Sequence, residues 1–128
     1  FGWYLKKIGS ISIKRGQITK DNLSFYDEIS NVITNTDRPL IIFPQGTRVL
    51  PDERPPFKKG ASKIYEKLKV ACQPVAINSG YVWPKLGRKI SNKTITISIL
   101  QRINNDLEKE MFLKTLEDKI YSELNLMN

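Results

Sequence analysis

The spacing of hydrophobic and polar residues changes several times along this chain, and each spacing predicts a type of element. Residues 1–8 are typical of the end of an amphipathic helix. Apolar residues recur every three to four positions in three further segments, which predicts helices with one buried face at residues 21–34, 61–68 and 107–124. Short apolar or alternating runs predict strands at residues 10–14, 40–43, 74–77 and 93–99.

This order of elements predicts an α/β fold formed by a single domain over residues 1–128. The run at residues 40–43 is apolar throughout, and such strands are usually covered on both faces, as in parallel sheets beneath helices. We therefore expect a mostly parallel central sheet covered by helices. Pro74 stands at the start of its predicted strand, where proline is tolerated although it has no N–H to donate.

The composition excludes several kinds of chemistry. The 128 residues include one cysteine, Cys72, and no histidine. A disulfide within the chain and a zinc site made of cysteine and histidine are therefore excluded, and these residues cannot supply a histidine base. No apolar run approaches the roughly 20 residues that a membrane-spanning helix requires. Because the first residue is Phe1 rather than methionine, we expect a processed form or part of a longer chain.

Positive charge is concentrated in the middle of the chain. The whole chain has a net charge of +8, whereas residues 51–102 hold eleven basic and three acidic residues and residues 103–128 have a net charge of −3. A positive zone suits phosphate groups, nucleic acid or an anionic bilayer, although a solvated lysine-rich surface has the same composition. Within this zone, Trp83 stands near Lys85 and Lys89, a combination found at bilayer interfaces, but the tryptophan could equally pack under a loop.

The most specific local feature is a turn directly after an apolar strand. Pro44 and Gln45 end the strand abruptly, at the position where open α/β sheets form their ligand crevice. Gly46 permits a ligand to approach the backbone closely, Thr47 offers a hydroxyl, and the planar fork of Arg48 suits two phosphate oxygens. Taken alone, the same peptide also fits an ordinary turn with a surface arginine.

Two further segments carry weaker signals of the same kind. Gly9 precedes an alternating run that ends in Lys14 and Arg15, where adjacent cations could serve a phosphate group. Lys58 and Lys59 stand at the entrance of a predicted helix, whose free N–H groups favour anions. Each of these patterns is also common at solvated surfaces.

Taken in order, these segments resemble the glycerolipid acyltransferase family, and in particular the 1-acylglycerol-3-phosphate acyltransferases. The third motif of the family reads Phe-Pro-Glu-Gly-Thr-Arg, and residues 43–48 match five of its six positions. The second motif is a glycine, a short apolar strand and a closing arginine, which Gly9 and Arg15 match at either end. The fourth motif centres on a proline in an apolar strand, here Pro74. The resemblance covers nearly all of residues 1–103.

The resemblance implies a fold like that of glycerol-3-phosphate acyltransferases, a reaction and a set of site residues. In the family, a histidine removes a proton from the free hydroxyl of 1-acylglycerol-3-phosphate (lysophosphatidate), and the oxygen attacks the thioester of acyl-CoA or acyl carrier protein to give phosphatidate. The resemblance further implies no metal or other cofactor, an anionic membrane surface at the cytoplasmic face, and no nucleic acid. The residues expected to bind substrate are Arg15, Gln45, Gly46, Thr47 and Arg48, and those expected to support the motifs are Gly9, Phe43, Pro44 and Pro74.

Two features depart from the family pattern. The first motif, His-x-x-x-x-Asp, is expected several tens of residues before Gly9, but only eight residues precede Gly9 and none is histidine. We therefore expect an N-terminally truncated, carboxyl-terminal portion of such an enzyme that is inactive alone. Gln45 stands where the family has glutamate; an amide can still bond a glycerol hydroxyl but carries no charge, so we expect binding to be retained.

Two other classes of function remain open from the residues alone. A nucleic-acid-binding module would also be basic, and Lys59, Lys63 and Lys67 recur every four residues along a predicted helix. No aromatic stacking platform or known nucleic-acid motif accompanies them. The other alternative is a non-catalytic lipid- or phosphate-binding relative that lacks the first motif altogether.

Overall fold

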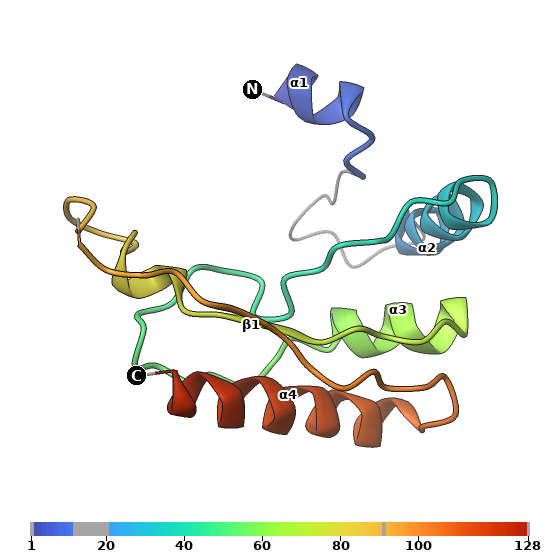
Figure 1. Cartoon of the computed structure of the whole chain (residues 1–128). Helices are drawn as coiled ribbons and strands as arrows, with labels where there is room; N and C mark the ends of the chain where they lie inside the picture. The colour runs from blue at the N-terminus through green and yellow to red at the C-terminus, as the bar shows by residue number, and fades with distance from the viewer. Residues whose placement is uncertain (1, 12–20, 91, 128) are drawn as a thin grey trace. The chain divides into compact units, whose positions relative to one another are not determined.

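The computed structural model describes residues 2–11, 21–90 and 92–127, and the elements in these ranges are shown in Figure 1. The elements divide between two compact units, residues 1–41 and residues 42–128. In chain order they are α1 (Gly2–Lys7), α2 (Asp21–Thr34), α3 (Gly60–Leu68), β1 (Val75–Ile77), the 3₁₀ helix η1 (Ser79–Tyr81), β2 (Ile97–Ile99) and α4 (Lys109–Leu126).

The N-terminal unit contains α1 and α2. α2 confirms the helix predicted for residues 21–34, and Ile29, on its predicted apolar face, is only 2 % exposed. After α1 the chain turns at Gly9, which has a φ of +82°. A Cβ at this position would lie 2.9 Å from Nη1 of Arg38, the nitrogen that donates a hydrogen bond to the Ile8 carbonyl at 3.2 Å. The end of the Arg38 side chain can move aside, so the positive φ is what favours glycine here.

Two of the predicted strands, at residues 40–43 and 10–14, are not confirmed. The buried strand expected at residues 40–43 is wrong, because this segment belongs to no strand and Ile41 and Phe43 are 76 % and 79 % exposed. An apolar run needs a neighbouring strand to bond its N–H and C=O groups, and none of the described residues provides one here. The strand expected at residues 10–14 falls mostly on residues outside the described ranges, and Ile11 belongs to no strand.

The sheet of the C-terminal unit is an antiparallel pair. β1 confirms the strand predicted at residues 74–77, and β2 confirms the last three residues of the strand predicted at 93–99. At the centre of the register Ala76 pairs with Ser98. Val75 pairs with Ile99 and Ile77 with Ile97, so the two strands run in opposite directions. An α/β class agrees with these elements, but the expected parallel central sheet is not found among the described residues.

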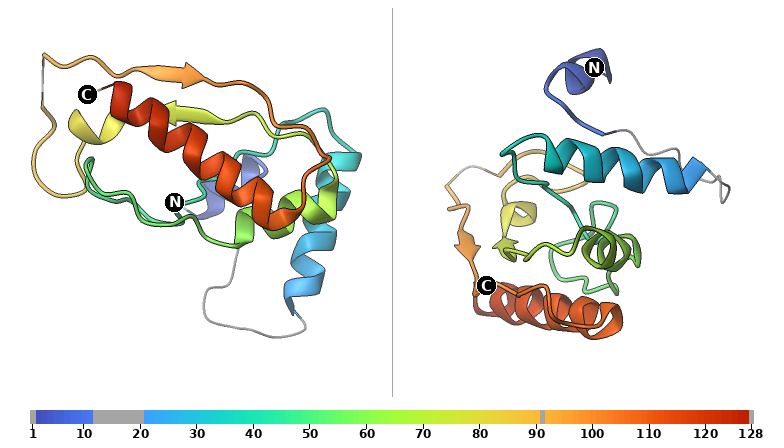
Figure 2. Two further views of the ribbon diagram at one scale, coloured as in Figure 1. Left: turned by 90° about the horizontal axis from the view of Figure 1, so that it is seen from below. Right: turned by 90° about the vertical axis from the view of Figure 1, so that its right-hand side faces the viewer.

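α4 lies along one face of the strand pair (Figure 2). Ala76 is fully buried, whereas alternate residues point to the opposite face and are exposed. The prediction of a buried strand at residues 74–77 is therefore correct for one face only. The exposed residues of the opposite face are Val75, Ile77, Ile97 and Ile99.

The core of the C-terminal unit lies where α3 packs against α4. The rings of Tyr65 on α3 and Phe112 on α4 stack with their centroids 3.7 Å apart and their planes within 5°. This stacked pair stands at the centre of a buried cluster that also draws residues from the connecting segments. The cluster consists of Phe57, Tyr65, Ile103, Phe112 and Leu116.

α4 confirms the last predicted helix, with a shift in its buried face. The spacing of residues 107–124 predicts an apolar stripe of Leu113, Leu116, Ile120 and Leu124, and of these Leu116 is buried. Leu113 and Ile120 pack against the edge of the core rather than inside it. Phe112, which the predicted stripe omits, is 2 % exposed, because the core is centred on the side of α4 that faces α3.

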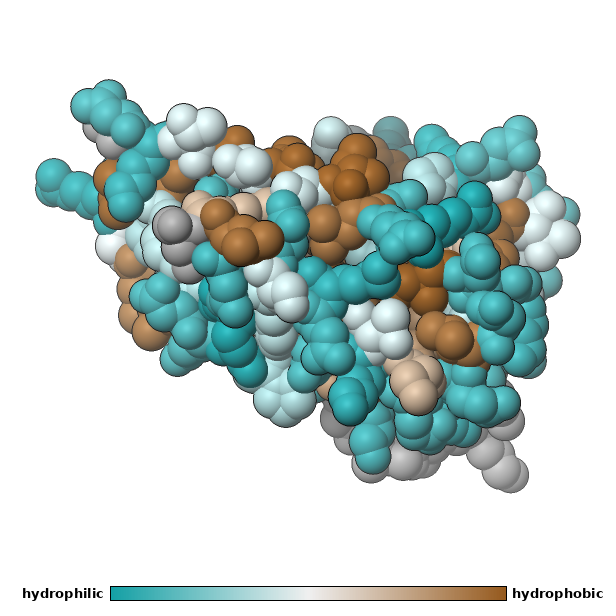
Figure 3. Space-filling model, turned by 60° about the horizontal axis from the view of Figure 1, so that its bottom comes forward, coloured by the Kyte–Doolittle hydropathy of each residue, from teal (hydrophilic) through white to brown (hydrophobic). Residues whose placement is uncertain are grey.

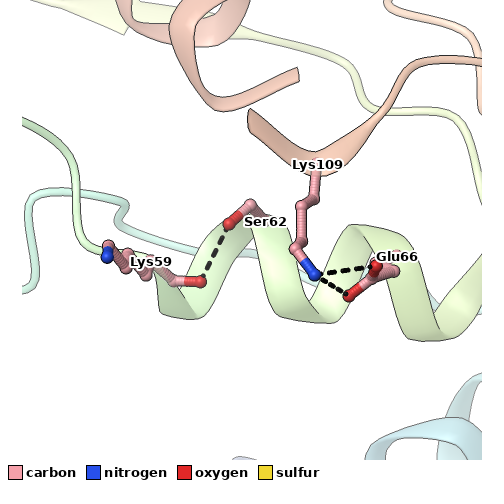
Figure 4. A network of polar contacts seen from close by, with 4 residues as sticks. All are labelled: Lys59, Ser62, Glu66 and Lys109. Carbon is pink, nitrogen blue, oxygen red and sulfur yellow. Dashed lines mark hydrogen bonds and ion pairs between the residues drawn. The ribbon is translucent and has the colours of Figure 1, made fainter. Parts of the chain in front are cut away.

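Polar contacts add a second link between α3 and α4 (Figure 4). Lys109, the first residue of α4, lies 3.2 Å from the Glu66 carboxylate of α3. At the start of α3, the Ser62 hydroxyl donates to the Lys59 carbonyl at 3.0 Å. The two ion-paired side chains are 42 % and 45 % exposed, so water and salt screen their attraction. The apolar cluster is therefore the main contact between the helices.

The surface mixes charged and apolar side chains. On the face shown in Figure 3, hydrophilic residues predominate and hydrophobic residues lie between them in separate groups. Large apolar side chains that are more than half exposed include Trp83, Leu86 and Leu126. Within the described ranges, no helix combines the length and the apolar character needed to cross a bilayer.

Candidate functional site

Residues 43–48, here named the motif loop, begin with a tight turn. The Gly46 N–H donates a hydrogen bond to the Phe43 carbonyl oxygen at 3.0 Å, which closes a four-residue turn. Proline in the second position and glycine in the fourth favour such turns. The Lys58 N–H donates to the Pro44 carbonyl at 2.8 Å, so the turn is also bonded to the segment that leads into α3.

The conformation of Gly46 explains why the motif needs glycine. Its φ of +70° lies in the left-handed region, which costs other residues roughly 1–2 kcal/mol. A Cβ here would lie 3.2 Å from Cγ of Lys58, which is a tight contact. The absence of a side chain therefore serves both the turn and its packing against Lys58.

Gln45 reaches from the motif loop to α4. Its amide nitrogen Nε2 donates to the Tyr121 hydroxyl oxygen at 3.3 Å, and the Tyr121 hydroxyl donates in turn to the Pro55 carbonyl oxygen. Both Gln45 and Tyr121 are half-buried. Burial raises the pKa of the Tyr121 phenol above its ordinary value. Since a tyrosine keeps its proton at neutral pH even without such a shift, the hydroxyl is a donor.

Two more polar side chains of α4 hold the segment that follows the motif loop. Oε2 of Glu117 accepts a bond from the Phe57 N–H at 2.6 Å, and Oδ1 of Asn125 accepts one from Nη2 of Arg54 at 3.1 Å. The Arg54 guanidinium also lies 5.6 Å from the centroid of the Tyr121 ring. Glu117, Tyr121 and Asn125 are spaced four residues apart on one side of α4, and we name them the polar stripe.

The end of the motif loop faces solvent. Thr47 and Arg48 are both exposed. Within the part of the chain that the structure describes, no carboxylate is ion-paired with Arg48. Its guanidinium carries five N–H donors in a planar fork, a geometry that matches two oxygens of a phosphate group. An anion could therefore bind Arg48 without displacing any of the described carboxylates.

The predicted site residues differ in how far the structure describes them. Residues 45–48 lie together in the motif loop of the C-terminal unit, whereas Gly9 belongs to the N-terminal unit. Arg15 lies outside the described residues. Pro74 is fully buried, and its carbonyl accepts a bond from the Leu100 N–H at 3.0 Å, which supports the start of β1. The roles of these residues in substrate binding stay predictions.

The polar stripe is the part of this region that the sequence reasoning missed. Glu117, Tyr121 and Asn125 do carry a signal, because polar residues recur at a spacing of four beside the apolar stripe of a predicted helix. The same spacing is typical of any solvated helix face. Only the contacts of these three residues with residues 45–57 distinguish a face that packs against the motif loop and the segment after it from an ordinary solvated face.

Other parts of the C-terminal unit do not add to this site. An open hollow of about 400 Å³ lies between α4 and the chain after β2, with Leu100, Lys119 and Glu123 among its lining residues. None of the predicted site residues lines it. Within the described ranges, no three cysteine or acidic side chains cluster in a way that could hold a metal ion.

The chain belongs to the acyltransferase family, since the sequence model of the family described as Acyltransferase matches residues 1–78, a range that includes the motif loop. It is 32 % identical over 89 residues to the 1-acyl-sn-glycerol-3-phosphate acyltransferase of Helicobacter pylori, and 30 % identical over 87 residues to that of Pseudomonas aeruginosa. Each alignment covers 68 % of this chain but only 38 % and 34 % of the two relatives. No solved structure gave a significant match.

These comparisons confirm the resemblance inferred from the motifs. The chain spans little more than a third of the length of the curated relatives it matches. α4 and its polar stripe lie beyond residue 78, outside the range that the family model matches.

Proposed function

We propose that residues 1–128 form the phosphate- and glycerol-binding part of a 1-acylglycerol-3-phosphate acyltransferase. The enzyme would transfer a fatty acyl group from acyl-CoA or acyl carrier protein to the free hydroxyl of lysophosphatidate and so make phosphatidate. The observation that carries the proposal is the motif loop, in which an ordered turn is followed by the exposed Arg48, which has no ion pair among the described residues. The names of the two relatives support the same substrate.

In this proposal each residue of the loop has a separate role. Arg48 binds the 3-phosphate through two parallel, charge-assisted hydrogen bonds, and Arg15 contributes a second cation. Gln45 bonds a hydroxyl of the glycerol, and Thr47 offers its own hydroxyl beside it. Because Gly46 has no side chain, the substrate can approach the backbone closely. Together these contacts hold the substrate hydroxyl in one orientation for attack on the thioester.

The proposed reaction also needs a base, and this chain contains no histidine. We propose that a histidine with an aspartate behind it, supplied by a segment outside residues 1–128, removes the proton from the lysophosphatidate hydroxyl. The resulting oxygen attacks the thioester carbonyl, the C–S bond breaks, and the thiolate leaves with a proton. No metal or other cofactor takes part in this proposal.

Purified residues 1–128 are expected to form no phosphatidate above background, because they lack the base. The measurement is transfer of a radiolabelled acyl group from acyl-CoA or acyl carrier protein to lysophosphatidate, with the full-length protein assayed in parallel. The full-length protein is expected to acylate lysophosphatidate. A rate for residues 1–128 near that of the full-length protein would mean that the base lies within this chain, and the division of roles would be wrong.

We also propose that the protein associates with the cytoplasmic face of an anionic membrane. The loop after η1 supports this proposal. Trp83 is 60 % exposed, and Leu86 is 79 % exposed. The ammonium group of Lys89 lies 3.9 Å from the centroid of the Trp83 ring. Amphipathic aromatic rings beside cations suit the headgroup region, and clustered cations favour anionic lipid by about 1 kcal/mol each near the surface.

Vesicle co-sedimentation tests this membrane proposal. Replacing Lys85, Arg88 and Lys89 together by glutamine is expected to weaken binding to phosphatidylglycerol-containing vesicles by about 100-fold, at roughly 1 kcal/mol for each charge. The matched control is Lys114→Gln on α4, which removes one charge and should change binding much less. Equal binding of the unaltered protein to anionic and neutral vesicles would contradict the proposal.

A further inference from the structure

The polar stripe of α4 contacts four residues of the segment 45–57. Tyr121 meets the motif loop at Gln45, and its hydroxyl also bonds the Pro55 carbonyl. Glu117 and Asn125, one helical turn to either side, bond the Phe57 N–H and the Arg54 guanidinium. The ring of Tyr121 packs edge-on against Phe57 of the core, with centroids 5.0 Å apart. Tyr121 therefore connects the motif loop to the best-packed part of the C-terminal unit.

The hydrogen bonds at Tyr121 determine which end of the Gln45 amide faces it. A tyrosine hydroxyl has one proton, and here that proton is donated to the Pro55 carbonyl. The group of Gln45 that lies 3.3 Å from the hydroxyl oxygen must then be a donor, which is the amide nitrogen Nε2. The carbonyl oxygen Oε1 of Gln45 is left as an acceptor that the Tyr121 hydroxyl does not use.

We propose that Tyr121 is a positioning residue for substrate binding, which fixes the Gln45 amide so that its carbonyl oxygen accepts a hydrogen bond from a glycerol hydroxyl. This inference rests on the proposed function, since it assumes that the motif loop binds lysophosphatidate. It also accounts for glutamine in place of the glutamate of the family motif. A carboxylate at position 45 would compete with the Pro55 carbonyl for the single proton of Tyr121.

The first test is Tyr121→Phe in the full-length protein, which keeps the ring and removes the hydroxyl. The KM for lysophosphatidate is expected to rise about three- to tenfold with kcat changed less than about twofold, since one hydrogen bond that orders the ground-state site is lost. The matched control is Tyr65→Phe, which removes a tyrosine hydroxyl that donates to the Asn104 carbonyl and accepts from the Leu107 N–H, away from the motif loop. An unchanged KM in Tyr121→Phe, or an equal rise in Tyr65→Phe, would overturn the proposal.

A double-mutant comparison tests whether Tyr121 acts through Gln45. Gln45→Ala is expected to raise the KM several-fold in the unaltered protein and less than about twofold in the Tyr121→Phe background, because the hydroxyl and the amide work as one unit. If the KM of the double variant rises by the product of the two single effects, Tyr121 affects binding independently of Gln45 and the proposal is wrong.

Hydrogen exchange separates this inference from the proposed function. In Tyr121→Phe the amides of Gly46 and Lys58, which close the turn and bond it to the α3 segment, are expected to exchange about five- to tenfold faster than in Tyr65→Phe. Unchanged exchange rules out the positioning role, whatever the protein acylates. If the amides exchange faster in Tyr121→Phe but the full-length protein does not acylate lysophosphatidate, then Tyr121 orders the motif loop and only the proposed function is wrong.

Discussion

Replacing Arg48 by alanine is expected to raise the KM for lysophosphatidate about 10- to 100-fold, with little change in the free energy of unfolding. The guanidinium is exposed and has no internal ion pair among the described residues, so its loss leaves no buried partner unsatisfied. A pair of charge-assisted bonds to a phosphate contributes roughly 1.5–3 kcal/mol, which corresponds to this range of KM. Steady-state kinetics with varied lysophosphatidate measure the effect.

Two variants make this result specific. Arg48→Lys keeps the charge but loses the planar fork, so a KM between those of the unaltered protein and Arg48→Ala is expected. Arg102→Ala removes an exposed cation that follows β2, and its KM should be unchanged. An unchanged KM in Arg48→Ala would remove Arg48 from the phosphate site and with it the main support for the proposed function.

Replacing Phe112 by alanine is expected to lower the free energy of unfolding by about 3–5 kcal/mol. Phe112 is 2 % exposed, and its ring stacks on Tyr65 with centroids 3.7 Å apart, so truncation leaves a cavity between α3 and α4. Equilibrium unfolding in urea, followed by circular dichroism, measures the change. Since total stabilities of single domains are about 5–15 kcal/mol, a loss of this size is a large fraction of the whole.

Met111 provides the matched control for this prediction. It precedes Phe112 on α4 but is 56 % exposed, so Met111→Ala should change the free energy of unfolding by less than about 0.5 kcal/mol. Phe112→Leu, which keeps an apolar side chain of similar length, should cost less than the alanine variant. A loss below about 1 kcal/mol in Phe112→Ala would mean that the stacked pair is not the centre of the core.

The stability of this core also bears on the candidate site. Phe57 belongs to the buried cluster, and its N–H bonds Glu117 of the polar stripe. The next residue, Lys58, bonds the Pro44 carbonyl in the motif loop. The turn that precedes Arg48 is therefore connected to the α3–α4 core through two consecutive residues.

Local sequence patterns predicted the helices well. α2, α3 and α4 were expected from apolar residues at helical spacing, because a helix positions its own side chains at a fixed period whatever else surrounds it. The turn at Gly46 was likewise foreseeable, since its conformation depends on the four residues that form it. The predicted strand at residues 40–43 was wrong because a strand exists only with a partner, and apolar composition does not supply one.

The sequence by itself determined the helices and the motif loop, because each depends on residues that are close together in the chain. It also determined membership of the acyltransferase family, because the family is recognised from short motifs and their order along the chain. Only the tertiary structure decided that β1 and β2 run antiparallel, that α4 covers one of their faces, and that Phe112 rather than its neighbours enters the core. It alone brought Tyr121 to Gln45, 76 positions away along the chain. Such contacts follow from how helices and strands pack, which no local period encodes.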